Sequence, residues 1–172
     1  MYQLITIIIA IALLSMVLGT GINWVSMQAL PRREAAIMAN AGYEALVAAV
    51  SAYRVANGSI PTPQPDGSLP PRLVPDYTPE PRAPEGMAWA YGVAPNGDLW
   101  VCMYGHGVKE PIWDGLENQA DRFPVGSVGL LGEPAADSSY GCGMPDGSGQ
   151  FYSSAKPVTF PARIFFSVKL NR

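Results

Sequence analysis

Few side chains in this chain could carry chemistry. The sequence of 172 residues has one histidine, His106, which stands between two glycines. A hydrolase or transferase needs a nucleophile with a base, a pair of acids or a set of metal ligands, and no nucleophile motif accompanies His106. Neither a Gly-x-Ser-x-Gly motif nor a phosphate-binding Gly-x-x-x-x-Gly-Lys-Ser/Thr loop occurs. We therefore predict a protein that is not an enzyme, with no catalytic residue, no cofactor and no small-molecule substrate.

Three acidic residues in loop-like sequence, Glu133, Asp137 and Asp146, are the other candidates for chemistry. Their spacing does not match the ladder of oxygen ligands in a calcium loop, so we predict solvated turn residues and no metal site. A periplasmic enzyme or ligand-binding protein with a lipid-facing anchor is the alternative from another class. An activity that disappears in His106→Ala would favour it.

The two cysteines, Cys102 and Cys142, stand in turn-like and strand-like sequence rich in glycine and proline. An even number of cysteines in an exported domain favours one disulfide. The bridge would close a loop of about 40 residues and stabilise the fold by about 3–4 kcal/mol. Two unrelated buried thiols in a cytoplasmic domain are the alternative.

The charge balance bears on the class of partner. The net charge is −3, and no cluster of lysine and arginine is visible in the sequence. A protein that binds nucleic acid needs such a cluster to neutralise phosphates. We therefore predict no nucleic-acid partner.

The N-terminal segment predicts a membrane anchor. Residues 1–31 contain no charge, and an apolar run begins at Leu4 and continues to Val25. About 20 apolar residues in a helix cross the hydrocarbon core of a bilayer. We therefore predict a transmembrane helix at residues 1–30, with lipid as one partner. A cleaved secretory signal, processed near the small residues 19–21, is the alternative.

The orientation of this anchor rests on two opposing signals. Arg32 and Arg33 follow the apolar segment, and by the positive-inside rule they favour a cytoplasmic C-terminal domain. The cysteine pair favours an oxidising compartment. We give the cysteines more weight and predict a single-pass protein of the bacterial inner membrane whose C-terminal domain lies in the periplasm.

Residues 31–172 have the length of one soluble domain. An amphipathic helix is predicted at residues 32–57, because apolar or small residues recur at intervals of three and four and the pattern stops at Asn57-Gly58. Residues 61–85 contain nine prolines, which predict an extended surface connector. The rest, residues 86–172, is predicted to be rich in β-structure.

A β-hairpin is predicted at residues 87–104, with Asn96-Gly97 as a two-residue turn. This turn sets Val93 opposite Trp100, Tyr91 opposite Cys102 and Trp89 opposite Tyr104. The predicted register gathers four aromatic residues on one face as a possible interaction surface: Trp89, Tyr91, Trp100 and Tyr104.

Further along the chain, residues 105–149 are predicted to be mostly turns, with a short helix near residues 116–122. Alternating apolar residues predict a closing, half-exposed strand at residues 162–170. The expected fold class is therefore α+β, with a long N-terminal helix (transmembrane, then amphipathic) packed on a small antiparallel sheet.

This layout resembles that of type IV pilins: an uncharged N-terminal helix, an amphipathic continuation with Tyr43, a variable loop, an antiparallel sheet and a late cystine. Pilins carry a glutamate at the fifth position of the mature chain, where this sequence has Ile5. A charged residue in the membrane segment marks a functional contact, so its absence removes the usual docking contact of a pilin subunit.

Over most of its length the chain is also similar to PilM-like inner-membrane proteins of type IVb thin-pilus and conjugative-transfer systems. The similarity lies in residues 41–53, in residues 69–77 and in a hairpin with Trp89 and Trp100. It implies a non-catalytic component of pilus biogenesis whose partners are pilus assembly proteins or pilins. The alternative is a minor pilin or type II secretion pseudopilin incorporated into a filament.

Overall fold

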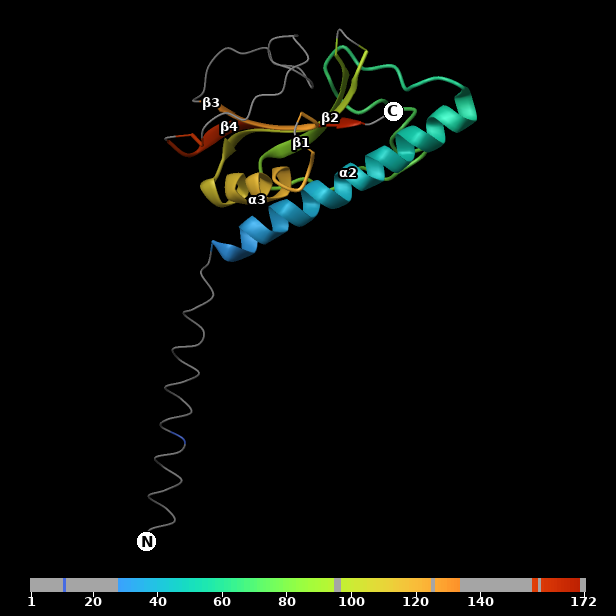
Figure 1. The fold of residues 1–172 in the computed structure, drawn as a ribbon. Helices are drawn as coiled ribbons and strands as arrows, with labels where there is room; N and C mark the ends of the chain where they lie inside the picture. The colour runs from blue at the N-terminus through green and yellow to red at the C-terminus, as the bar shows by residue number, and fades with distance from the viewer. Residues whose placement is uncertain are drawn as a thin grey trace. The chain divides into compact units, whose positions relative to one another are not determined.

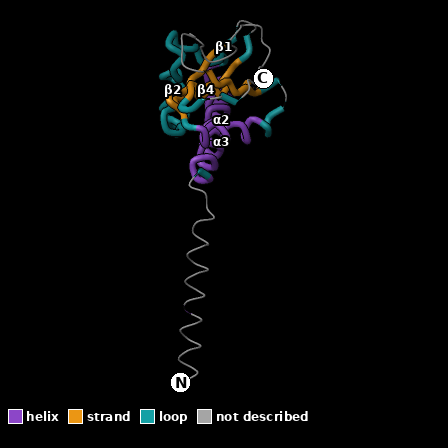
Figure 2. Tube along the Cα trace, turned by 90° about the vertical axis from the view of Figure 1, so that its left-hand side faces the viewer, coloured by secondary structure: helices purple, strands orange, loops and turns teal. Residues whose placement is uncertain are grey.

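Four antiparallel strands form one sheet in the order β1-β2-β4-β3, and two helices lie on one side of it (Figures 1 and 2). This computed structural model describes residues 11, 28–94, 97–124, 126–133, 156–157 and 159–170. The elements in chain order are α2 (Ala29–Asn57), β1 (Met87–Val93), β2 (Leu99–Val108), α3 (Glu110–Ala120), β3 (Val128–Glu133) and β4 (Ala162–Leu170). The fold is α+β as predicted, and a long helix on a small antiparallel sheet is consistent with a pilin-like layout.

The chain divides into two units, Met1–Leu30 and Pro31–Arg172. A transmembrane helix is predicted for the first unit, at residues 1–30, and nearly all of these residues lie outside the described part of the chain. The second unit holds the sheet and α3, and it is described by itself below.

Helix α2 confirms the amphipathic helix predicted at residues 32–57 and begins three residues earlier. Its inward residues are spaced by three and four, so they form one face of a helix. Beyond the helix, Gly58 adopts a φ of +68°, and its N–H donates to the carbonyl oxygen of Arg54 at 2.9 Å. This left-handed residue ends the helix where the sequence predicts. The buried residues are Ala35, Ala39, Gly42, Leu46, Ala49, Val50 and Tyr53.

The register predicted for the hairpin is wrong by one residue. Val93 pairs with Leu99, Tyr91 with Val101 and Trp89 with Met103. In the predicted register residue 95 would have donated a ladder hydrogen bond, but it is a proline and has no N–H. Instead, the N–H of Ala94 donates to the carbonyl oxygen of Asp98 at 2.8 Å. Gly97 has a φ of +82°, so the connection matches the longer loop in which a left-handed glycine follows a turn.

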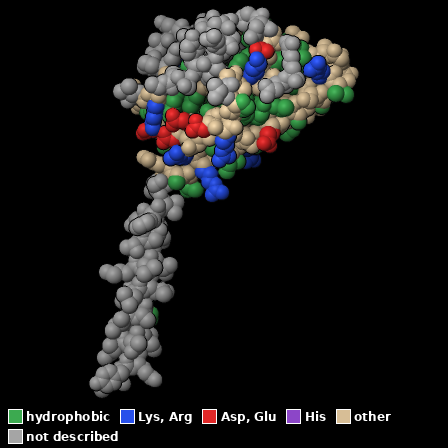
Figure 3. Space-filling view, viewed as in Figure 1, with side chains coloured by type: hydrophobic (Ala, Val, Ile, Leu, Met, Phe, Trp, Pro, Cys, Tyr) green, Lys and Arg blue, Asp and Glu red, His purple; other side chains and the backbone are tan. Residues whose placement is uncertain are grey.

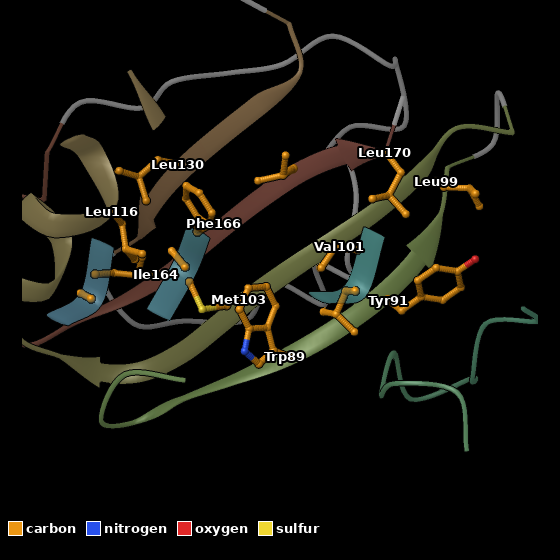
Figure 4. Close-up of a cluster of buried hydrophobic side chains, with 14 of the residues drawn as sticks. Trp89, Tyr91, Leu99, Val101, Met103, Leu116, Leu130, Ile164, Phe166 and Leu170 are labelled. Carbon is orange, nitrogen blue, oxygen red and sulfur yellow. The ribbon is translucent and has the colours of Figure 1, made fainter. Parts of the chain in front are cut away.

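This one-residue difference divides the predicted aromatic face, because side chains alternate between the faces of a strand. Trp89 and Tyr91 lie on the face that forms the main core with α2 and α3, together with Met103 (Figure 4). Trp100 and Tyr104 lie in a second cluster on the opposite face.

Strand β4 has the predicted bounds but not the predicted position. It pairs with β2 on one side and with β3 on the other, so it is central rather than a closing strand. Ser167 on its polar face is only 6% exposed, so the prediction that this strand is half exposed is also wrong. Strand β3 was missed, since Val128–Glu133 has two glycines in six residues and little alternation.

The short helix predicted near residues 116–122 is α3, and it begins six residues earlier, at Glu110. Pro111 occupies its first turn, where a proline costs no hydrogen bond. Gly115 interrupts the apolar pattern, so the sequence did not indicate the first half of this helix. A Cβ at Gly115 would overlap the carbonyl oxygen of Arg32, so the glycine lets α3 approach α2 closely.

The proline-rich residues 61–85 form no helix or strand. They do more than cross the surface, however. The N–H groups of Leu73 and Val74 both donate to the carbonyl oxygen of Pro70, which fixes a turn. Leu73 is completely buried in the main core. This part of the chain is therefore anchored to the folded unit.

Candidate functional site

The four aromatic residues predicted as an interaction surface do not form one surface. Trp89, Tyr91 and Trp100 are 6%, 1% and 1% exposed, and only Tyr104 is half-buried. Burial removes the first three from direct contact with a partner. They stabilise the fold from the two faces of the sheet instead.

Trp89 joins three segments of the chain. A Cβ at Gly42 of α2 would overlap the Trp89 ring, so this glycine creates the space in which the indole packs. The indole Nε1–H donates to the carbonyl oxygen of Arg82 at 3.0 Å, which satisfies its one polar group. Trp89 therefore fixes α2 and the proline-rich segment to β1.

Tyr91 has a similar role at the other end of the core. Its hydroxyl donates to the carbonyl oxygen of Pro61 at 3.1 Å, and its N–H donates to the carbonyl oxygen of Gly67 at 3.0 Å. Burial, followed by the neighbouring Tyr53, raises the pKa of Tyr91 to about 12. The ring is therefore a neutral, buried connection between β1 and the proline-rich segment.

The second face of the sheet carries Trp100, Cys102 and Tyr104. The Tyr104 ring stacks on Phe165 of β4 with centroids 6.3 Å apart, and the Arg163 guanidinium lies 5.0 Å from the centroid of the Phe165 ring. A guanidinium positioned above an aromatic ring is attracted electrostatically to the face of that ring.

Cys102 is 1% exposed in the middle of β2. Cys142, its predicted partner, lies outside the described residues. The Cys102–Cys142 disulfide therefore stays a prediction.

The candidates for catalysis and metal binding remain separate. His106 is exposed near the end of β2. Asp137, Asp146 and the side chain of Glu133 lie outside the described residues. Within the part of the chain that the structure describes, no three His, Cys, Asp or Glu residues gather where they could hold a metal ion.

Charged side chains of both signs are interspersed on the face seen in Figure 3. Lys156 bridges Glu110 and Asp114 of α3 at 2.7 Å each, and these two carboxylates raise the pKa of its amine. Lys109 pairs with Glu85 at 3.0 Å. These contacts are solvent-exposed, so each contributes little to stability.

The outward face of α2 is the apolar surface that sequence analysis did not single out. Leu30, Ile37 and Val55 are 66%, 57% and 89% exposed. Between them on the same face lie the small residues Ala41 and Ala48 and the charged residue Glu44, all of them exposed. Single exposed apolar residues are ordinary, but a row along one helix face provides a surface on which a second helix can pack closely.

Length and hydropathy do not decide the environment of α2. Among the described residues it is the one helix long and apolar enough to cross a membrane. Seven of its residues, however, are buried in the folded unit. Core helices of soluble domains and signal sequences have the same composition, so this criterion is weak evidence for a membrane span.

Comparison with known proteins adds no relative. No family model, no curated protein and no solved structure matches this chain.

Proposed function

We propose that this protein is a non-catalytic, membrane-anchored component of type IV pilus biogenesis, of the IVb, thin or conjugative kind, that acts by protein–protein contact. The observation that supports this most is the division of α2 into two faces. One face is buried against the sheet, and the other exposes Leu30, Ile37 and Val55. Exposed apolar and small residues along a helix face provide a surface for another helix, although Glu44 also lies on this face.

The sequence preceding α2 supports a membrane anchor that would hold this contact surface close to the bilayer. Residues 1–31 carry no charge, and Arg32 and Arg33 follow at the start of the soluble unit. A helix anchored in lipid would meet other anchored helices in the plane of the membrane. The proposed partners are therefore pilus assembly proteins or pilins, with lipid around the anchor.

A minor pilin or type II secretion pseudopilin is the second candidate. The observation that favours it is the long helix packed on a small antiparallel sheet, which is consistent with a pilin-like layout. In that case the N-terminal segment would leave the bilayer and enter a filament. Mass spectrometry of the native N-terminus separates the two candidates, because a methylated N-terminal residue would favour the filament subunit.

The proposed location is the inner membrane, with the C-terminal unit in the periplasm. Alkaline carbonate washing of membranes should leave the protein in the pellet. Thiol labelling of a Glu80→Cys variant by an impermeant reagent should succeed in intact spheroplasts, because Glu80 is exposed and lies outside the proposed contact surface. Release by carbonate, or labelling that requires lysis, would contradict the proposed location.

The predicted Cys102–Cys142 disulfide belongs to this proposal, since a periplasmic domain can keep it. Closing a loop of about 40 residues should stabilise the fold by about 3–4 kcal/mol. Cys142→Ser should therefore lower the free energy of unfolding by that amount under oxidising conditions. Adding a reductant should abolish the difference from the native protein. A difference that persists in reductant would exclude the bridge as its cause.

Mild crosslinking in native membranes, followed by purification of this protein, tests the function itself. We expect recovery of pilus assembly proteins or pilins. A matched variant with a charge on the outward face of α2, Ala48→Arg, should lose them while the fold persists, because a charge in an apolar helix contact is costly. Recovery of the native protein alone would contradict the proposal.

A further inference from the structure

A cavity of about 200 Å³ lies between the last turns of α2 and the proline-rich segment. Three prolines and one aromatic ring supply its apolar walls. Its polar groups come from Thr62, Gln64 and Arg72, together with the Tyr53 hydroxyl. The lining residues are Tyr53, Pro61, Thr62, Gln64, Pro70, Pro71 and Arg72.

The walls formed by Tyr53 and Pro61 are held in place by contacts with other parts of the folded unit. The Tyr53 ring packs edge-on against Tyr77 with centroids 5.4 Å apart, and the Asn57 amide donates to the Tyr77 hydroxyl at 3.0 Å. The carbonyl of Pro61 is held by the Tyr91 hydroxyl. A site whose walls are fixed before binding loses less entropy when it is occupied.

The rim is fixed by the turn that begins at Pro70. The N–H of Leu73 donates to the Pro70 carbonyl oxygen at 2.8 Å, and the Leu73 side chain is 0% exposed. Arg72 stands immediately before this anchored residue and is exposed. Its backbone is therefore tied to the core while its guanidinium is open to solvent.

Two polar groups of the cavity have no partner among the described residues. The Tyr53 side chain is only 8% exposed, and its hydroxyl makes no hydrogen bond within that part of the chain. This oxygen is not one of the buried polar atoms that lack a partner, so it is accessible from the cavity. The Arg72 guanidinium likewise has no ion pair there, although the chain carries a net charge of −3.

We propose that this cavity binds a carboxylate side chain of a partner protein, with Arg72 pairing the carboxylate and the Tyr53 hydroxyl donating a hydrogen bond to it. A guanidinium offers a planar fork that matches a carboxylate. The prolines and the Tyr53 ring supply apolar contact for the methylene groups of the same side chain.

The size of the cavity limits the ligand. Pockets for cofactors and drug-sized molecules measure about 300–1,000 Å³, so this smaller cavity suits a single side chain. The choice of a protein as the source of the carboxylate rests on the proposed function, whereas the carboxylate chemistry rests on the cavity alone.

Ligand-observed NMR on the full chain in detergent micelles tests this inference. The probe is the peptide Ac-Ala-Glu-Ala-NH₂, and Ac-Ala-Gln-Ala-NH₂ is its uncharged counterpart. We expect the glutamate peptide to bind with a Kd on the order of 1 mM, and the glutamine peptide to bind at least about ten-fold more weakly. Glucuronate and inorganic phosphate test other sources of an anion.

Three variants assign the binding to the cavity. Arg72→Gln should weaken the glutamate peptide by about ten-fold or more, since it removes the charge-assisted bond. Tyr53→Phe keeps the ring and should weaken binding about three- to ten-fold. Arg82→Gln is the matched control, because Arg82 is an exposed arginine of the same proline-rich segment that does not line the cavity. It should bind as the native protein does.

Several outcomes would overturn the inference. These are equal binding of both peptides, undiminished binding by Arg72→Gln, no binding of the glutamate peptide, or binding of glucuronate or phosphate in preference to it. Crosslinking to pilus proteins is measured separately. An absence of peptide binding would therefore not contradict the proposed function, and a failed crosslink would not contradict the proposed carboxylate site.

Discussion

The two faces of α2 are both rich in alanine, but one is buried and the other is exposed. The inward face buries Gly42 and Leu46, which are among the most enclosed positions of the helix. The outward face leaves Ile37 and Val55 more than half exposed. The difference arises from the neighbours, because the inward face meets the Trp89 ring and the strands of the sheet. One face of this helix therefore supplies the core while the other stays exposed, although both faces are rich in alanine.

This comparison separates stability from function. Substitutions on the inward face should change the free energy of unfolding. Substitutions on the outward face that keep a similar helix propensity should leave it nearly unchanged and, if the proposed function is right, alter association with partners.

The largest expected effect is on the inward face. Leu46 is 0% exposed, so Leu46→Ala should lower the free energy of unfolding by about 2–5 kcal/mol through lost burial and the cavity left behind. Val55→Ala on the outward face should change it by less than about 0.5 kcal/mol. Chemical denaturation of the full chain in detergent measures both. Equal effects would break the distinction between the faces.

A smaller effect tests the Gly42–Trp89 contact. Replacing glycine by alanine in a helix normally stabilises it by about 1 kcal/mol. Gly42→Ala should instead cost about 1–3 kcal/mol, because the added methyl overlaps the Trp89 ring. The reverse change on the outward face, Ala48→Gly, should cost about 1 kcal/mol, as propensity alone requires. A stabilising Gly42→Ala would show that the indole has room to move.

The smallest effect concerns Tyr91 beside the inward face. Its pKa is raised to about 12 in the fold, against about 10 in an unfolded chain. The neutral phenol is therefore favoured by folding, and its stabilising contribution is complete below about pH 10 and is lost as the pH rises toward 12. Tyr91→Phe should reduce the fall in stability over this range and cost about 1 kcal/mol at neutral pH through the lost bond to Pro61. An unchanged pH dependence would contradict this assignment.

Periodic patterns within one segment made part of this fold predictable. Helix α2 and strand β4 have near-complete hydrophobic periods, and their bounds were predicted to within three residues. The hairpin register was missed because Asn96-Gly97 suggested a two-residue turn, whereas Pro95 cannot donate the bond that such a turn needs. The central position of β4 depends on pairing with distant strands, which no local pattern records.

The candidate sites depended even more on tertiary structure. The aromatic surface predicted in the hairpin was divided by a register error of one residue. Tyr53 and Arg72 line one cavity although they come from a helix and a proline-rich turn. Neither residue stands in a motif, so only the three-dimensional arrangement brings them together.

Photo-crosslinking from the outward face of α2 tests the central claim most directly. A photoreactive amino acid at Ala48, which is exposed on α2, should crosslink in native membranes to a pilus assembly protein or pilin identified by mass spectrometry. The same group at Glu80, an exposed residue of the proline-rich segment, should not. If Ala48 gives no such crosslink, or if Glu80 gives the same products, then α2 is not the contact surface and this account is wrong.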